Sequence, residues 1–306
     1  MSVKIFVGYH KPSKFLVKSD LFVPLQLGRK IVNQPSKDGA LNKKDILWME
    51  KNTIGDDSGD NISELNRFYC ELTGIYWIYK NYEHIGNPDY IGFMHYRRLF
   101  DFDGTLEKIP LLKPMQEELL APENISLKTQ ISLLDLYLKH YTPELIEAII
   151  KKYKVIRTYP IEETTFLRSK REKHKFEFDY VKKHYPDIFD NLQKQIKNGT
   201  VSYKNMFVMQ RDDFFAYAKF MFEILQLNKD DIEPREKGYL AEILTSAYLE
   251  YLSNLHNSYL GCRFFSLYYK VPFLKLKLLV CQLGIALSFG ETKQRFKKKK
   301  GILKTK

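Results

Sequence analysis

The first third of the chain alternates short apolar runs with a longer stretch whose apolar residues recur at helical spacing. Residues 3–8 and 89–94 are short apolar runs, which are typical of buried strands. Between them, residues 62–82 repeat apolar side chains at steps of three and four and predict one amphipathic helix. Pro12 favours a loop after the first strand. A strand followed by a polar loop is a typical opening of nucleotide-binding folds.

The same alternation continues to about residue 255. The pattern predicts helices over residues 143–153, 176–197, 214–227 and 238–255, and strands over residues 155–158 and 201–209. No internal repeat or Gly/Ser linker interrupts this part of the sequence. We therefore predict one α/β domain over residues 1–260 and a C-terminal extension over residues 261–306.

The predicted extension combines an apolar segment with a basic tail. Residues 271–289 are mostly apolar, but Lys275 and Lys277 interrupt them and argue against a membrane-spanning helix. Residues 291–306 hold eight basic residues and one glutamate, which is +7 of the formal net charge of +12 and leaves +5 elsewhere. Such a helix and tail can dock on an anionic membrane surface, with about 1 kcal/mol per basic residue. The alternative is a helix packed on the domain, followed by a solvated tail.

Charge and cysteine spacing exclude several classes of protein. Proteins that read nucleic acid spread their basic residues over a face of the domain, whereas here the excess lies in the tail, so we expect no nucleic-acid partner. The three cysteines lack C-x-x-C spacing and the histidines lack H-E-x-x-H spacing, so no zinc site is expected. The N-terminus does not resemble a secretory signal. We expect a cytoplasmic protein, peripheral on the inner face of the cell membrane.

A carboxylate-rich segment, residues 56–63 (DDSGDNIS), leads into the predicted helix. Carboxylates at a helix start can cap the helix and complement its dipole, and we expect this role for one or two of them. Ser58 and Gly59 allow a ligand to approach closely, so another side chain of the segment can accept hydrogen bonds from a nucleotide base or ribose, or ligate a metal together with His95. We expect Asp57, Asp60 and Asn61 to bind the nucleotide part of a donor.

The second apolar strand is followed by His95, Tyr96, Arg97 and Arg98. Open α/β sheets bind ligands at the carboxyl ends of their strands. The planar guanidinium of Arg97 or Arg98 suits bidentate contact with the phosphates of a leaving diphosphate. Because adjacent strand residues face opposite ways, we expect at most one of the two arginines to enter the site, and at least one to be an ion-paired or surface residue. His95 could contact a phosphate, ligate a metal, act as a base, or be a hydrogen-bonded structural residue.

Two aspartates could hold a metal ion. Asp101 and Asp103 have the D-x-D spacing that can bind Mn²⁺ or Mg²⁺. A solvated turn before Gly104 explains the same residues better. The preceding strand ends in a histidine and two arginines, so we favour fixed cationic side chains over a metal. The sequence indicates no other cofactor.

Further candidates lie near the two ends of the predicted domain. Tyr9 could stack on a nucleotide base beside His10, although ordinary packing explains Tyr9 equally well. Transfer to a hydroxyl group needs a general base, and Glu242, early in the last predicted helix, is our candidate. Asp212 and Asp213 are rivals whose position at the start of a helix fits N-capping.

Four strings occur in order along the chain: DSGDNIS (residues 57–63), YCELTGIYW (69–77), YIG with HYRR (90–98) and NMFVM (205–209). Together they resemble the bacterial family catalogued as domain of unknown function 4422, over roughly residues 3–251. Members of this family are associated with capsular and exopolysaccharide gene clusters and are regarded as glycosyltransferases, some of them galactofuranosyltransferases. The resemblance implies a GT-A-like, Rossmann-type mixed sheet flanked by helices.

The residues and the resemblance together predict a glycosyltransferase. It would move a hexose, such as galactofuranose, from a UDP-sugar to a lipid-linked oligosaccharide during capsule or exopolysaccharide biosynthesis. The departing diphosphate gathers negative charge that arginines or a metal would stabilise. One alternative is a noncatalytic module that binds sugar nucleotides or polysaccharide beside a synthase. Another, a phosphoryl-transfer enzyme, is disfavoured because the chain lacks G-x-x-x-x-G-K-[ST].

Overall fold

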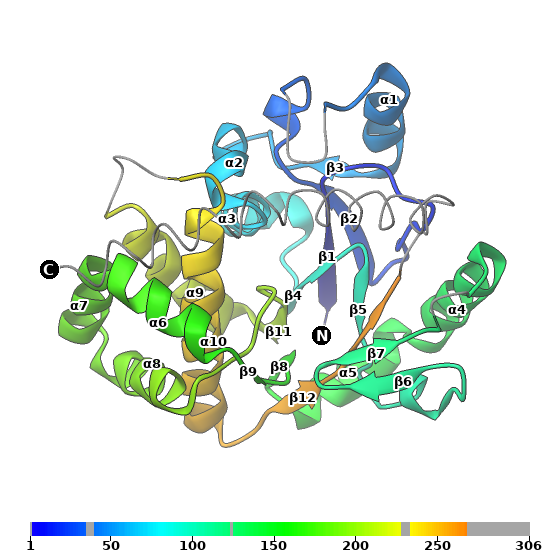
Figure 1. The fold of residues 1–306 in the computed structure, drawn as a ribbon. Coiled ribbons are helices and arrows are strands. Elements are labelled where there is room, and N and C mark those ends of the chain that lie inside the picture. The colour runs from blue at the N-terminus through cyan, green and yellow to red at the C-terminus, as the bar shows by residue number, and fades with distance from the viewer. Residues whose placement is uncertain (1, 35–39, 123–124, 228–232, 268–306) are drawn as a thin grey trace, which may run out of the picture. The chain divides into compact units, whose positions relative to one another are not determined.

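One mixed sheet forms the centre of the molecule (Figure 1). The computed structural model describes residues 2–34, 40–122, 125–227 and 233–267. Across the sheet the strands run β3 (Ile54–Gly55), β2 (Phe22–Gln26), β1 (Val3–Tyr9), β4 (Tyr90–His95), β11 (Phe207–Gln210), β8 (Val155–Thr158) and β12 (Leu260–Cys262). These neighbours pair in parallel, except that β11 runs antiparallel to β4 and β8. The carboxyl ends of β1 to β4 therefore meet at one edge.

A tight hairpin at this edge leads from β4 into β5 (Arg98–Phe100). His95 pairs with Arg98, so Tyr96 and Arg97 form the turn. Residues directly opposite each other in an antiparallel pair project from the same face, which places His95 and Arg98 side by side. The sheet continues through β13 (Phe264–Ser266), β7 (Glu118–Leu120) and β6 (Lys113–Met115), and β9 (Ile161–Glu162) pairs separately with β10 (Thr200–Val201).

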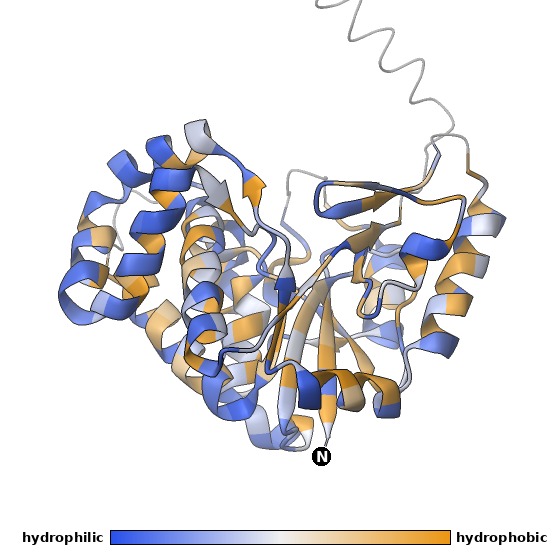
Figure 2. Cartoon of the chain, turned by 90° about the horizontal axis from the view of Figure 1, so that it is seen from below, coloured by the Kyte–Doolittle hydropathy of each residue, from blue (hydrophilic) through white to orange (hydrophobic). Residues whose placement is uncertain are grey.

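Helices cover both faces of the sheet. They are α1 (Lys43–Asn52), α2 (Asn66–Tyr69), α3 (Leu72–Lys80), α4 (Leu127–His140), α5 (Pro143–Lys152), α6 (Thr164–Lys173), α7 (Lys175–His184), α8 (Pro186–Asn198), α9 (Arg211–Leu225) and α10 (Glu236–His256), with 3-10 turns at Arg29–Ile31, Ser63–Leu65, Tyr82–Ile85 and Leu106–Lys108. Because strand side chains alternate, Phe6 and Phe93 pack with α3, α9 and α10, whereas Val7 and Met94 pack with α4 and α5. Figure 2 shows the apolar strands between helices with hydrophilic outer faces.

The predicted α/β class is confirmed, with a mixed, mostly parallel sheet flanked by helices. Strands β1, β4 and β8 and helices α5, α9 and α10 lie within about three residues of their predicted ranges. The sequence did not predict β2, α1, α4 and α6, nor the short strands β3, β5, β6, β7, β9, β12 and β13. α1 is short and mostly polar, and it is defined by a capping box between Asn42 and Asp45 rather than by an apolar stripe.

Three predicted elements are interrupted in the structure. The helix expected over residues 62–82 is divided into α2 and α3 by Cys70, whose φ is 50°. The helix expected over 176–197 breaks at Tyr185, because a residue before proline avoids helical geometry. The strand expected over 201–209 is interrupted by Lys204 and Asn205, whose φ values are 87° and 49°. A left-handed residue ends a regular helix or strand.

The compact unit extends beyond residue 260. Strands β12 and β13 belong to the sheet, and the chain divides into a unit over Met1–Leu267 and a second over Tyr268–Lys306. The predicted apolar segment 271–289 and basic tail 291–306 lie outside the described residues. Within the described ranges, no helix is long and apolar enough to cross a membrane.

Candidate active site

Two glutamates lie near the hairpin that carries His95 and Arg98. Glu71 immediately precedes α3, and one of its carboxylate oxygens is 3.9 Å from Nε2 of His95. Glu242 lies in the second turn of α10 and accepts a hydrogen bond of 3.2 Å from the backbone N–H of Lys204. Both glutamates are also close enough to Arg98 for its positive charge to lower their pKa. Residues distant in the sequence thus form one charged cluster.

Strained backbone surrounds this cluster. Seven non-glycine residues in the described part of the chain have positive φ, and four of them lie here: Cys70, Lys204, Asn205 and Arg235. Cys70 precedes Glu71, Lys204 and Asn205 contact the two glutamates, and Arg235 precedes α10. Such conformations are costly and persist where the surrounding structure holds them, often at functional sites.

A buried hydrogen-bond chain fixes the carboxylate of Glu71. The side-chain amide of Asn205 donates to Glu71 at 2.8 Å, and its amide oxygen accepts from the Thr245 hydroxyl at 2.8 Å. The Tyr217 hydroxyl lies 2.8 Å from the same threonine oxygen. Asn205 and Thr245 are each 1% exposed, so water cannot replace these bonds. Glu71 is therefore held in one orientation.

The two carboxylates perturb each other. Burial and then the neighbouring Glu71 raise the pKa of Glu242 to about 7, against the opposing effects of Lys204 and Arg98. Burial also raises the pKa of Glu71, and the Asn205 amide, Arg235 and Arg98 oppose that rise. A carboxylate with a pKa near neutrality can both accept and release a proton at physiological pH. Glu242 is thus suited to acid–base chemistry.

His95 is neutral in this environment. Burial lowers the pKa of His95 to about 3, and the charge of Arg98 acts in the same direction. Its Nε2 lies 2.6 Å from the carbonyl oxygen of Lys204, which can only accept, so this nitrogen carries the proton. Nε2 is therefore not free to donate to a phosphate, and the low pKa makes His95 a poor base. The structural alternative explains this histidine best.

The two predicted clamp arginines have different surroundings. Arg97 lies in the hairpin turn, with its guanidinium 5.1 Å from the centre of the Tyr96 ring. Arg98 is partly buried, on the face of the sheet that bears His95, and its charge acts on both glutamates. Arg98 is thus the better placed of the two to meet an anionic ligand.

The acidic segment before α2 is held mainly by internal hydrogen bonds. Asp56 is fully buried and accepts bonds from Gly28 N, Arg29 N, Ser63 Oγ and Thr73 Oγ1 at 2.6–3.0 Å. The Asn61 amide donates to the backbone oxygens of Asp57 and Gly59. Asp60 is exposed and bonds to Tyr76 and Lys80 on α3. Most polar groups of this turn therefore stabilise the local fold.

Within this segment, Asp57 is the carboxylate best placed to meet a ligand. It follows β3 and is partly buried, and a Cβ added at Gly55 would lie 2.3 Å from its Oδ1 and 2.6 Å from Arg29. Arg29, which the sequence reading missed, is fixed by bonds to Gln26 and Thr53. An acidic and a basic side chain thus cover the end of β3.

Tyr9 does not present a ring to a ligand. It is fully buried, and its hydroxyl donates to Phe15 O and accepts from Val17 N. Its ring stacks on Tyr96 at 4.9 Å. The packing alternative therefore explains Tyr9. His10 is exposed at the end of β1, with its ring edge against Tyr96.

The aspartates of the D-x-D string serve the local fold. Asp101 is buried and accepts bonds from Leu106 N, Glu107 N and the Tyr141 hydroxyl. Asp103 accepts from Thr105 N and lies 2.8 Å from the ring of His140. No group of three or more His, Cys, Asp or Glu among the described residues is arranged to hold a metal ion. The chain does turn before Gly104 as expected, but Asp101 is buried rather than solvated.

Asp212 and Asp213, the two alternative candidates for the general base, lie at the start of α9. Asp212 is exposed and ion-paired with Arg211, and Asp213 bonds to His256. Among the described residues, neither aspartate forms a hydrogen bond or an ion pair with the charged cluster.

Four residues at or beside the charged cluster were not predicted as site residues: Glu71, Lys204, Asn205 and Arg235. Glu71 and Asn205 lie inside the strings that carry the family resemblance, so a signal was present, although no chemical motif distinguished them.

The comparison with protein families matches residues 4–254 to the family described as "Domain of unknown function (DUF4422)". The chain therefore belongs to the DUF4422 family. Among solved structures, the fold is similar to that of "WbbM bifunctional glycosyltransferase" in its apo form, with a TM-score of 0.63 and 24% sequence identity. The similarity covers 88% of this chain and 46% of that chain, so it spans less than half of the solved protein. No curated protein matches the sequence.

Proposed function

We propose that this protein is a glycosyltransferase with a GT-A-like fold, transferring a hexose from a UDP-sugar to a growing polysaccharide. The observation that carries the proposal is the pair of partly buried glutamates, Glu71 and Glu242, near the hairpin that carries Arg98, whose charge lowers the pKa of both. The similarity of the fold to the WbbM structure supports the same class.

Each group has a role in this proposal. Glu242 takes the proton of the acceptor hydroxyl, whose oxygen then bonds to the anomeric carbon of the donor as the bond to the diphosphate breaks. Arg98 and Lys204 stabilise the charge that collects on the departing diphosphate. Asp57, with Arg29, binds the nucleoside end. Residues 291–306 would hold the protein at the membrane that carries a lipid-linked acceptor.

The decisive experiment measures UDP release from a panel of UDP-hexoses, UDP-galactofuranose included, in the presence of a lipid-linked oligosaccharide acceptor, with and without EDTA. We expect release from at least one donor, and we expect it to persist in EDTA because cationic side chains replace the metal. UDP binding without release would support the noncatalytic module instead. Loss of UDP release in EDTA would instead support a mechanism that depends on a metal ion bound by carboxylates.

Replacing Arg98 by alanine is expected to lower turnover at least tenfold, a loss of about 1.4 kcal/mol of transition-state stabilisation. Arg97→Ala is the matched control, and we expect it to change turnover less than threefold because Arg97 lies over Tyr96 in the turn. Equal effects of the two variants on the rate of UDP release would contradict the assignment.

Replacing Glu71 by glutamine should move the acidic limb of the pH–rate profile. A base must be ionised, so activity of the native protein should rise with pH through about 7. Glutamine keeps the Asn205 hydrogen bond but removes the like charge that raises the pKa of Glu242, so the limb should shift to lower pH. Glu64→Gln, at an exposed position, is the control. An unmoved limb in kcat/KM would reject the coupling.

A further inference from the structure

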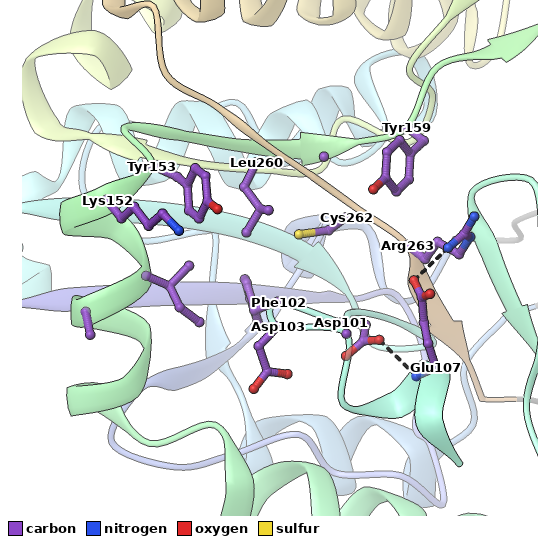
Figure 3. A pocket seen from close by; sticks show the side chains of 14 residues that line it. Asp101, Phe102, Asp103, Glu107, Lys152, Tyr153, Tyr159, Leu260, Cys262 and Arg263 are labelled. Carbon is purple, nitrogen blue, oxygen red and sulfur yellow. Dashed lines mark hydrogen bonds and ion pairs between the residues drawn. The ribbon is translucent and has the colours of Figure 1, made fainter. Parts of the chain in front are cut away.

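A cavity of about 500 Å³ lies at the carboxyl end of α5 and is lined also by the loop after β5, by β12 and by Arg263. In Figure 3, Tyr153, Leu260 and Tyr159 line one side, and Asp101, Asp103 and Glu107 line the other. Its volume falls in the usual range for ligand pockets, roughly 300–1,000 Å³. None of the roles proposed above uses it.

The polar groups of the cavity are held in fixed positions. Arg263 donates to Glu107 at 2.7 Å and to the backbone oxygen of Gln116 at 2.9 Å, and its guanidinium lies 5.4 Å from the centre of the Tyr159 ring. Asp103 is held by Thr105 and His140. Tyr159 nevertheless remains 42% exposed. The ring of Tyr159 is thus accessible to a ligand, and the carboxylate and guanidinium groups around it are held in place by hydrogen bonds.

This lining disfavours a phosphate or another anion. Three carboxylates outnumber Lys152 and Arg263, and α5 ends at Lys152, so the negative end of its dipole faces the same space. It also disfavours a metal ion, because both oxygens of Asp101 accept hydrogen bonds from the chain. Uncharged sugars fit better: their C–H faces stack on aromatic rings, and planar carboxylate and guanidinium groups bind their hydroxyls.

The cavity is linked to the candidate active site by contacts in two places. Gln116, which accepts from Arg263, is followed by Glu117, whose carboxylate is 3.6 Å from Nζ of Lys204. The backbone of Lys204 donates to Glu242. On the other side, Thr158, which precedes Tyr159, donates to the carbonyl oxygen of Tyr203. The cavity and the candidate active site are thus joined through the segments that carry Glu117, Tyr159 and Lys204.

We propose that this cavity binds uncharged sugar residues of the acceptor, behind the residue that receives the transferred hexose. The inference rests on the proposed glycosyltransferase function, because it assigns the cavity to the acceptor of that reaction. Tyr159 supplies the stacking surface, and Asp103, Glu107 and Arg263 bind the hydroxyls.

The test screens the full-length protein on an array of bacterial oligosaccharides and polysaccharides, then titrates the best-bound neutral glycan by calorimetry. Tyr159→Ala should raise its Kd at least tenfold, and Asp103→Asn should raise it several-fold with less risk to folding. Tyr259→Ala is the matched control: Tyr259 is 50% exposed and outside the lining, and we expect an unchanged Kd. Melting temperatures of all variants report on folding.

An unchanged Kd in folded Tyr159→Ala and Asp103→Asn, or no neutral glycan bound by the native protein, would overturn the inference. UDP release by the native protein is measured separately. Release with an unchanged Kd in both variants means that the cavity assignment fails while the proposed function stands. Conversely, weakened glycan binding in the variants without any UDP release means that the cavity binds glycan but the proposed enzyme does not exist.

Discussion

Replacing Glu242 by glutamine is expected to lower turnover at least about a hundredfold and, at the same time, to stabilise the fold above pH 7. General-base catalysis contributes roughly 10²- to 10⁴-fold, and glutamine cannot accept the proton of the acceptor hydroxyl. Its amide oxygen can still accept the hydrogen bond from Lys204, so the local structure should persist. The rate of UDP release in the presence of acceptor measures the loss.

The gain in stability follows from the raised pKa of Glu242. In the unfolded chain its pKa is near the usual 4.5, and in the fold it is about 7, so the folded state binds the proton more tightly. Stability conferred by the protonated form is present at low pH and is lost as pH rises from about 4.5 to about 7. At pH 8 the variant should unfold with a free energy higher by on the order of 3 kcal/mol.

Urea unfolding of the two proteins at pH 5 and pH 8 measures this difference. At pH 5 most of it should disappear, because Glu242 is then protonated in the folded native protein. Glu172→Gln, at an exposed position in α6, is the control and should change neither turnover nor stability. A variant that is less stable than the native protein at pH 8 would show that the Glu242 carboxylate stabilises the fold.

Replacing Asp56 by alanine is expected to destabilise the protein by about 4 kcal/mol. The change leaves two backbone N–H groups, of Gly28 and Arg29, and two hydroxyls, of Ser63 and Thr73, without their acceptor in a buried site. Each buried donor left without a partner costs roughly 1–3 kcal/mol, although the hydroxyls can turn to other acceptors. The midpoint of urea unfolding should fall with little change in slope.

Asp60→Ala is the matched control from the same segment. Asp60 is exposed, and its bonds to Tyr76 and Lys80 are at the surface, so the expected loss is below about 1 kcal/mol. If the two alanine variants were equally stable, the network around Asp56 would not hold the turn. A large loss of activity in folded Asp56→Ala would then point to a direct role in binding.

Local pattern was enough to predict most of the fold. Residues 3–8, 89–94 and 155–158 form strands as predicted, because short apolar runs are stable only where both faces of the sheet are covered. The breaks at Cys70, Lys204 and Asn205 could not be predicted, since these residue types do not require positive φ. Tertiary contacts around the glutamates impose that geometry.

The candidate site was predicted in part. Position at the end of a strand indicated His95 and Arg98, and the hairpin pairing then places them on one face. The structure favours the structural alternatives for His95 and Tyr9 over roles in ligand binding, because both side chains are shielded from solvent. His95 is neutral because it is buried beside Arg98, and Tyr9 is enclosed by Phe15 and Val17. Desolvation depends on neighbours from distant segments, which periodicity cannot reveal.

The sequence by itself determined the family, the α/β class and the edge of the sheet where the charged residues gather, because these depend on local periodicity and on the order of motifs. Only the tertiary structure brought Glu71 and Glu242 together, raised the pKa of Glu242 to about 7 and formed the open cavity beside Tyr159. The physical reason is that proximity and burial are properties of the packed chain. In the unfolded chain, Glu71 and Glu242 would have the usual pKa of a glutamate side chain.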